Sequence, residues 1–448
     1  MRSPYTRFGL VLAALTLTAC SGLLDVKDPD IINPGDVQNA DGAVAAYNGA
    51  IGDFAFANDG DNGGTEGQIL VSGVMSDEYI DVETFPTRIE YDSRAIAERN
   101  GTLTAVYFNL HKARVALEGA ASALQQYLDT SKTRIAEMLA LAGFTHVYFA
   151  ENYCSAVPFS ARQPDGSILY GDPETTTQIL DRAISRFDSA LGMTTNAAIV
   201  RLASVGKGRA LLDKGDFVGA NTAVAGVTPG QYQTAHSLST GRQQNGVYVF
   251  NNPGGARAGT GRFAVAEAEG TNGLNFRSAN DPRVVDTIIG LGFDNVSPLS
   301  VLLKYSGPTS SVQVAGYVEA RLIRAEAALH GGTPLAVIDT LNAIRADAAN
   351  NGGFTLAALT DPGTAVGREN LLFRERAFWL FATGHRLGDL RRLARAPYGR
   401  AVNTIYPIGP YPKGTVYGSN TELPVPFDER NNPKYLQAFP NGCDYNTP

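Results

Sequence analysis

The sequence predicts a mainly α-helical fold, a scaffold of helix hairpins that carries long irregular loops and little β structure. Three observations predict it. Apolar residues recur every three or four positions over several long segments. Two of these segments contain a Gly turn between helix-like halves, and two other stretches are rich in Gly, Asn and Asp. The 448 residues include 48 Gly and are 44% hydrophobic, which fits a packed scaffold with turn-rich connections.

The helical pattern is clearest between Leu103 and Leu128, where it persists for seven turns. Four further blocks repeat the spacing, and the fourth block of the chain is broken at Gly331-Gly332: residues 135–153, 180–191, 317–349 and 368–395. Strand-like alternation is sparse. Residues 247–250 and 300–303 are the best short candidates for strands.

Two segments resemble each other as helix hairpins, residues 210–227 and 327–344. Each has an apolar helix, a Gly turn, and a second helix with small or apolar residues every three or four positions. This arrangement is similar to the tetratricopeptide repeat, in which small residues let two helices pack closely. There is no clean 34-residue period, so a pair of ordinary helical hairpins stays open as the alternative.

Two stretches are expected to be loops, residues 52–94 and 229–312. Both are rich in Gly and Asn, and the second has aromatic residues interleaved, Phe293 among them. Irregular regions of this length in a compact protein usually serve function. We therefore expect a ligand region at about residues 229–312, with a contribution from residues 52–94.

The overall charge argues against one class of partner. The formal net charge is -7, and no long basic run is present. Nucleic acid is therefore not an expected partner. After residue 20 the sequence has no stretch of 18 apolar residues, so no membrane-spanning helix is expected there.

The N-terminus has the pattern of a lipoprotein signal. Arg2 and Arg7 precede a short apolar segment, which ends in Leu17-Thr18-Ala19-Cys20. Small residues before a Cys form a lipobox, at which signal peptidase cuts and the thiol receives a lipid. We expect a signal peptide at residues 1–19, a lipidated tether at 20–40 beginning at Cys20, and one helical domain at 41–448. An ordinary secretory signal with a chance Cys is the alternative.

Two further cysteines follow, Cys154 and Cys443, far apart in the sequence. Export permits a disulfide. Two lone thiols do not by themselves favour one, so the sequence leaves the bridge open and the unpaired state is the expectation.

The sequence contains no recognised catalytic or cofactor motif. There is no His-Glu-x-x-His, no Gly-x-Ser-x-Gly and no Walker loop. Residues 59–64 superficially resemble a calcium loop, but Leu70 stands where the bidentate Glu belongs. No catalytic residue, metal site or cofactor is therefore predicted. The charged block around Glu375 and Asp389 is expected to form structural ion pairs with Arg residues, which hold the C-terminal segment against the helices and fix geometry.

Taken together, these segments resemble the SusD-like (RagB) lipoproteins over nearly the whole chain. Residues 20–26 are similar to that family's start, and Asn280-Asp281-Pro282-Arg283 contains its Asp-Pro-Arg element. Other matches, in the family's order, are residues 149–158, 317–327, 342–345, 374–392 and 423–433. Two features depart from the family pattern: Leu387-Gly388 replaces a Trp-Phe pair, and the closing Asn-Pro-Gly-Tyr is absent.

The resemblance implies a cell-surface lipoprotein that does no chemistry. Such a protein would bind a nutrient, a glycan or oligosaccharide above all, and deliver it to a SusC-like TonB-dependent transporter. It would be anchored by its lipid to the outer membrane and face the cell exterior. A helical-repeat scaffold for another envelope protein is the second interpretation, and a secreted hydrolase is the third.

The ligand site is expected on the loops, with aromatic rings stacking on sugars and polar groups bonding hydroxyls. Tyr248 and Phe250 would share one face of a short strand. The predicted ligand-binding residues are Tyr79, Phe85, Tyr248, Phe250, Asn251, Asn252 and Arg257.

Overall fold

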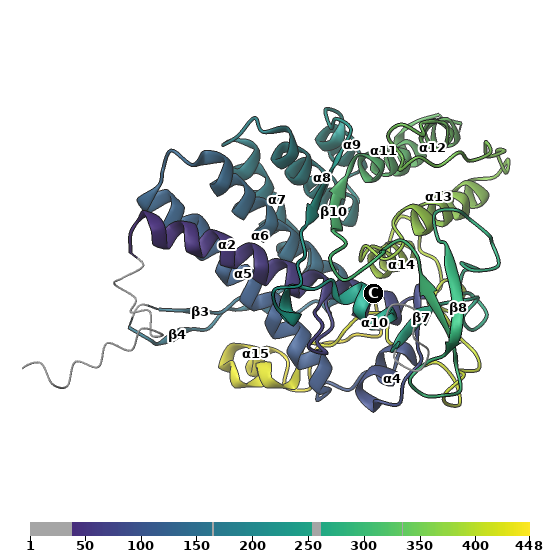
Figure 1. Ribbon diagram of the computed structural model, residues 1–448, viewed down its shortest axis with the longest axis horizontal. Coiled ribbons are helices and arrows are strands. Elements are labelled where there is room, and N and C mark those ends of the chain that lie inside the picture. Colours follow the sequence, from purple (N-terminus) through teal and green to yellow (C-terminus); the bar gives the residue numbers. More distant parts are fainter. Residues whose placement is uncertain (1–37, 164, 253–260, 334) are drawn as a thin grey trace, which may run out of the picture.

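The computed structural model describes residues 38–163, 165–252, 261–333 and 335–448, and it confirms the mainly helical fold (Figure 1). Helices pack in sequence order, each against the next: α2 on α5, α5 on α6, and so on to α11 on α12. They are α2 (Ala40–Asp59), α5 (Gly101–Tyr127), α6 (Lys132–Asn152), α7 (Thr176–Leu191), α8 (Ala197–Asp213), α9 (Phe217–Val224), α11 (Tyr317–Gly331) and α12 (Ala336–Ala346). This stack is the predicted tetratricopeptide-like scaffold.

Small residues allow the close packing that the sequence suggested. The ring of Phe187 on α7 lies between Gly143 on α6 and Gly206 on α8. A Cβ at Gly143 would stand 2.6 Å from the ring, and one at Gly206 would stand 2.3 Å from it. Both distances are too short for a real contact, so the three helices approach as they do because neither glycine has a side chain.

The fifth helical block forms two helices rather than one. α13 (Ala365–Trp379) and α14 (Arg386–Ala394) are separated by a short turn that contains Gly384 with φ +73°. The predicted ion pairs are present. Asp389 pairs with Arg376 and Arg392, and Glu375 pairs with Arg283 and Arg345. These pairs join α12, α13, α14 and the loop at residue 283. The C-terminal segment is joined to α14 by Arg391, which pairs with Glu422.

The strands of the described residues form small two-stranded antiparallel sheets. β1 (Tyr79–Asp81) pairs with β7 (Phe263–Val265), and β8 (Asp286–Leu291) pairs with β9 (Pro298–Leu302). The other pairs are β10 (Val312–Gly316) with β6 (Gln231–Thr234), β2 (Val157–Pro158) with β5 (Pro173–Glu174), and β3 (Ala161–Arg162) with β4 (Ile168–Leu169). Residues 300–302 of the strand predicted at 300–303 are therefore part of β9.

Residues 52–94 are more ordered than the sequence predicted. α2 continues to Asp59, and α3 (Gln68–Met75) and α4 (Pro86–Asp92) follow. Every residue of α3 is buried, so its apolar residues show no helical stripe for a pattern search to detect.

Residues 247–250 were predicted as a strand, and this was wrong. They form the helix α10 (Gly246–Asn251), whose start is capped by the Asn245 side chain accepting from the Tyr248 N–H over 2.9 Å. Val247, Val249 and Phe250 are all buried. The apolar alternation therefore reflects contacts on several sides of a short helix and not one face of a strand.

The expectation of unpaired cysteines was also wrong, because Cys154 and Cys443 form a disulfide. The C-terminal segment carries the short helices η3 (Val402–Thr404), η4 (Phe427–Asn431) and α15 (Pro433–Ala438). It returns to the end of α6, where the Leu423 N–H donates to the Asn152 carbonyl over 2.7 Å. The spacing of Cys154 and Cys443 in the sequence could not predict the disulfide, because the two thiols meet only when the C-terminal segment folds back onto α6.

The N-terminal predictions lie outside the described residues, the signal peptide and Cys20 included. Among the helices described, none is long and apolar enough to cross a membrane.

Candidate ligand-binding surface

Two phenylalanines from the two expected loop regions meet at the surface. Phe85 comes from residues 52–94 and Phe293 from residues 229–312. Their ring centroids lie 6.2 Å apart with an interplanar angle of 34°. The two residues remain 48% and 44% exposed, respectively. We call this pair the aromatic platform.

The backbone around Phe85 is set by the residue that follows it. Pro86 occupies the first turn of α4, where its fixed φ and missing N–H are tolerated. Phe85 is therefore the last residue before the helix, in an extended conformation. This position turns its side chain out of the helix rather than onto the helix face.

Phe293 is held in the turn between β8 and β9. Its N–H donates to the Gly261 carbonyl over 3.1 Å, and the Asp294 N–H donates to the Val82 carbonyl over 2.9 Å. Gly292 fits closely against Val82, because a Cβ there would stand 2.5 Å from the Cβ of Val82. A larger residue at 292 would displace the turn and with it the ring of Phe293.

A small apolar core supports the platform from beneath. It consists of Val82, Ala264, Leu299 and Val301, all buried, with Ile80 and Ile289 packed against it. These residues come from β1, β7, β8 and β9 or from directly beside them, so the platform rests on side chains that three separate chain segments contribute.

Arg88 fixes the base of the platform on the α4 side. Its guanidinium lies 5.3 Å from the centroid of Phe85 and pairs with Glu66 and, over 2.8 Å, with Glu83. Burial alone would lower the pKa of Arg88, but the two carboxylates outweigh it and raise the pKa. The charge of Arg88 is therefore neutralised by Glu66 and Glu83, and Arg88 is not free to bind ligand.

Lys413 reaches the same place from the C-terminal segment. Its Nζ lies 3.1 Å from Asp81 and 3.0 Å from Asp294, and it donates to the Glu83 carbonyl over 2.6 Å. Burial would raise the pKa of Asp294, but N–H groups of Ser297 and Val296, the Ser297 hydroxyl and Lys413 hold it at about 2. The carboxylate of Asp294 is thus permanently charged and fixes the Phe293 turn.

The platform offers flat apolar faces next to polar groups. Arg262 is partly exposed, with its guanidinium 5.1 Å from the buried ring of Phe250. Asn295 is exposed beside Phe293. Aromatic faces stack on the C–H surfaces of sugar rings, while guanidinium and amide groups bond hydroxyls. The arrangement therefore suits a shallow site for an oligosaccharide.

The structure places most of the residues predicted to bind ligand beneath the surface. Tyr79 and Phe250 are fully buried, and Tyr248 packs half-buried against the core. Asn251 and Asn252 are buried in α10 or at its end, and Arg257 lies outside the described residues. Of the four predicted aromatics, Phe85 alone is exposed, and the exposed aromatic beside it is Phe293 rather than Tyr79 or Phe250.

The sequence pointed to Phe293 only as one of several loop aromatics, not as a ligand residue, and did not point to Arg262 or Asn295. One signal was available for Phe293, since it follows Gly292 directly and stands among polar residues, Asp294, Asn295 and Ser297. An aromatic residue in a turn of that kind has no local core to enter. Its pairing with Phe85 depends on tertiary contacts.

A second aromatic surface lies elsewhere in the fold. A cavity of about 610 Å3 is lined by Trp379, Tyr317 and Phe354, among other residues. The indole of Trp379 is already engaged, because Arg283 lies 4.8 Å from its ring and its N–H donates to Glu375 over 3.2 Å. Trp379 is also only partly exposed, whereas Phe85 and Phe293 are 48% and 44% exposed, so it offers less free aromatic face than the platform does. In the described part of the chain, no group of three or more His, Cys, Asp or Glu side chains is arranged to hold a metal ion.

Comparison with known proteins identifies the fold. No family model and no curated protein matches the sequence. Several solved structures match the whole architecture. A SusD superfamily protein from Bacteroides vulgatus ATCC 8482 matches at 16% identity, with 88% of this chain and 97% of that chain covered and a TM-score of 0.61.

Two other structures are similar to the same extent. A laminarin-binding SusD-like protein matches at 15% identity, with 88% and 98% of the two chains covered and a TM-score of 0.61. Surface glycan-binding protein A from Bacteroides thetaiotaomicron matches at 10% identity, with 91% and 100% covered and a TM-score of 0.63. The chain therefore has the SusD-like fold.

Proposed function

We propose that this protein is a carbohydrate-binding SusD-like protein, with its ligand on the aromatic platform. The observation that carries the proposal is the exposed Phe85–Phe293 pair, which two distant segments bring together and a dedicated small core supports. A contiguous exposed apolar patch marks an interaction site more often than a single exposed side chain does, and the two neighbouring rings form such a patch. Two structures of the same fold are named for glycan or laminarin binding, which supports this class of ligand.

The wider role follows from the sequence. The lipobox at Cys20 supports lipid anchoring, and the family resemblance supports the outer membrane as the site of anchoring and a SusC-like TonB-dependent transporter as partner. The protein would capture the oligosaccharide and pass it on unchanged. Recovery of a transporter barrel with the protein from native membranes, in mild detergent and low salt, tests that partner.

The ligand proposal is tested by a glycan array, followed by calorimetry on the glycan that binds. Phe85→Ala and Phe293→Ala should each weaken binding by about 1–3 kcal/mol, the contribution of an aromatic contact. The melting temperature should change little, because both rings are half exposed. Phe108→Ala is the matched control, since Phe108 is 43% exposed on α5, away from the platform.

Two outcomes would contradict the platform. Unchanged affinity in both Phe85→Ala and Phe293→Ala would place the site elsewhere. If Trp379→Ala then removed binding, the cavity at Trp379 would be the site. Release of a cleaved glycan during the assay would support the hydrolase interpretation instead.

A further inference from the structure

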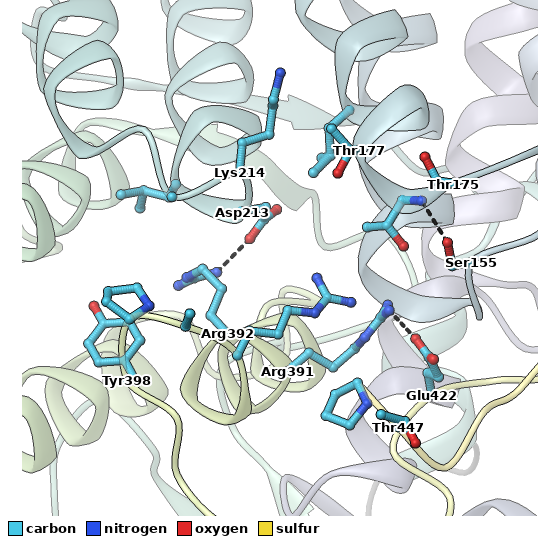
Figure 2. A pocket seen from close by; sticks show the side chains of 18 of the residues that line it. Ser155, Thr175, Thr177, Asp213, Lys214, Arg391, Arg392, Tyr398, Glu422 and Thr447 are labelled. Atoms are coloured by element: carbon cyan, nitrogen blue, oxygen red, sulfur yellow. Dashed lines mark hydrogen bonds and ion pairs between the residues drawn. The ribbon is translucent and has the colours of Figure 1, made fainter.

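A cavity of about 420 Å3 lies in the helical scaffold and shares no residue with the platform. Thr175, Thr177 and Lys214 lie on one side of it, and Arg391 and Arg392 of α14 lie on the other (Figure 2). Its walls are the first turn of α7, the turn between α8 and α9, and the end of α14 with the residues that follow. This volume would hold a molecule of about monosaccharide size.

Three of the four cations in the wall already have anionic partners. Arg392 donates to Asp213 over 2.8 Å, and also pairs with Glu326 and Asp389. Arg391 pairs with Glu422, as Figure 2 also shows, and Lys214 pairs with Asp181. Both carboxylates of the wall, Asp213 and Glu422, are therefore engaged.

Arg395 is the exception. Its side chain lines the cavity, yet among the described residues it has no hydrogen bond and no ion pair. Burial and the neighbouring charge of Arg391 lower its pKa to about 10, although the carboxylates of Glu422 and Asp213 act in the opposite direction, so it stays a cation at neutral pH. A partly buried charge without a partner costs free energy unless an anion or water compensates it. In addition, the buried Nε of Arg391 has no acceptor.

The opposite wall also favours an anion. The positive end of the α7 dipole lies at Thr176, whose N–H donates to the Ser155 hydroxyl over 3.1 Å. The hydroxyls of Thr176 and Thr177 make no hydrogen bond within the described structure and line the cavity. Thr176 and Thr177 thus line the cavity together with Arg391, Arg392 and Arg395.

We propose that this cavity binds an oxyanion, the carboxylate of an acidic monosaccharide or an inorganic sulfate or phosphate, with Arg395 as its main partner. The planar guanidinium matches two oxygens of such a group. Thr176 and Thr177 would bond the remaining oxygens or hydroxyls. This site is independent of the carbohydrate site proposed at the platform.

The test is titration calorimetry of the purified protein with sodium glucuronate, sodium sulfate and sodium phosphate, at constant ionic strength in chloride. Neutral glucose is the ligand control. We expect saturable binding of at least one oxyanion, and a loss of about 10- to 100-fold in affinity in Arg395→Gln. Glucuronate binding more tightly than both inorganic ions would identify the carboxylate as the natural group, and the reverse order would identify an inorganic ion.

Two matched variants separate this site from general charge effects. Arg134→Gln makes the same charge change at an exposed position of α6 and should leave affinity unchanged. Arg395→Gln should melt close to the unaltered protein in chloride, because the Arg395 side chain has no hydrogen bond or ion pair to lose among the described residues. The proposal is overturned if no oxyanion binds saturably, or if binding survives in Arg395→Gln. Phe85→Ala should not affect oxyanion binding, so the two sites can fail separately.

Discussion

Arg376 of α13 and Asp389 of α14 face each other in the core through two parallel hydrogen bonds of 2.9 and 2.8 Å. Both side chains are 2% exposed. Burial would raise the pKa of Asp389, but Arg376 and Arg392 outweigh it and hold that pKa far below its usual range. The pair fixes the angle between the two helices.

Replacing Asp389 by Asn should therefore destabilise the fold strongly. Arg376 and Arg392 would lose their shared carboxylate while staying buried, which should lower the free energy of unfolding by about 3–5 kcal/mol. Denaturant unfolding measures the change. The control is Asp129→Asn, which breaks an exposed pair with Lys132 and should leave stability unchanged. Equal stability of Asp389→Asn and the unaltered protein would contradict this role.

Stability should fall as the pH rises from about 5 to 8. Burial raises the pKa of Asp81 to about 8 and that of Asp92 to about 7, and it raises the pKa of Glu269 strongly. The folded protein therefore keeps protons that the unfolded chain loses near pH 4, so raising the pH favours unfolding. Carboxylates with lowered pKa, such as Glu118 at about 2, act in the opposite sense at lower pH. Buried His111, His146 and His385, whose pKa burial lowers, also act in the opposite sense, up to about pH 6.5, so the decline should be steepest above that pH.

Asp92→Asn provides the test of this pH dependence. The amide cannot ionise, and it can donate to Glu269. Its oxygen can still accept from Tyr411 and from the Asp81 N–H, as Asp92 does over 2.9 and 3.1 Å. The loss of stability between pH 5 and 8, measured by denaturant unfolding, should shrink by at least about 1.4 kcal/mol, the equivalent of one pKa unit. Parallel pH profiles of the two proteins would show that this cluster does not cause the decline.

Asn251 should act on stability and not on ligand contact. Its side chain donates to the Phe263 and Ser300 carbonyls over 2.8 and 3.0 Å and accepts from the Leu302 N–H over 2.6 Å. It thus joins β7 to β9 beneath the platform. Asn251→Ala leaves these groups unpaired and should cost about 2–4 kcal/mol of unfolding free energy.

Asn295→Ala is the surface counterpart for this comparison. Asn295 is exposed beside Phe293, so its replacement should spare stability and weaken ligand binding. The reverse result, with Asn251→Ala stable but unable to bind, would return Asn251 to the list of ligand contacts.

The disulfide should stabilise the C-terminal segment against the end of α6. Cys154 and Cys443 close a loop of 289 residues, and removing a native disulfide typically costs about 2–5 kcal/mol. The double variant Cys154→Ala/Cys443→Ala should therefore melt at a lower temperature. A reducing agent should lower the melting temperature of the unaltered protein and not that of the double variant. If reduction affects both proteins equally, the bridge is not the cause.

Cys20→Ala tests the proposed anchor. The variant should fail to incorporate labelled lipid and should accumulate as an unprocessed or released form, because the thiol is the expected attachment point. Membrane fractionation with metabolic lipid labelling measures both. Normal membrane association together with undiminished lipid label would exclude Cys20 as the anchor.

Periodic signals in the sequence were sufficient for most of the helical scaffold, but not for α2, whose second half was expected to be loop. The pattern from Leu103 to Leu128 corresponds to α5, and the break at Gly331-Gly332 separates α11 from α12. Such helices can be predicted from periodicity because one side is buried along many turns. The same method missed α3 and misread α10, since short segments buried on several sides leave no period to detect.

The sequence by itself determined the helix class, the hairpin scaffold, the charged pairs around Asp389 and the two regions that meet at the surface. Tertiary structure alone decided that Tyr79 and Phe250 enter the core while Phe85 and Phe293 stay outside. It also decided that Cys154 meets Cys443 and that Arg395 lacks a partner. The physical reason is shared: periodicity reports contacts within a few turns of chain, whereas burial and pairing depend on segments hundreds of residues apart that only the completed fold brings together.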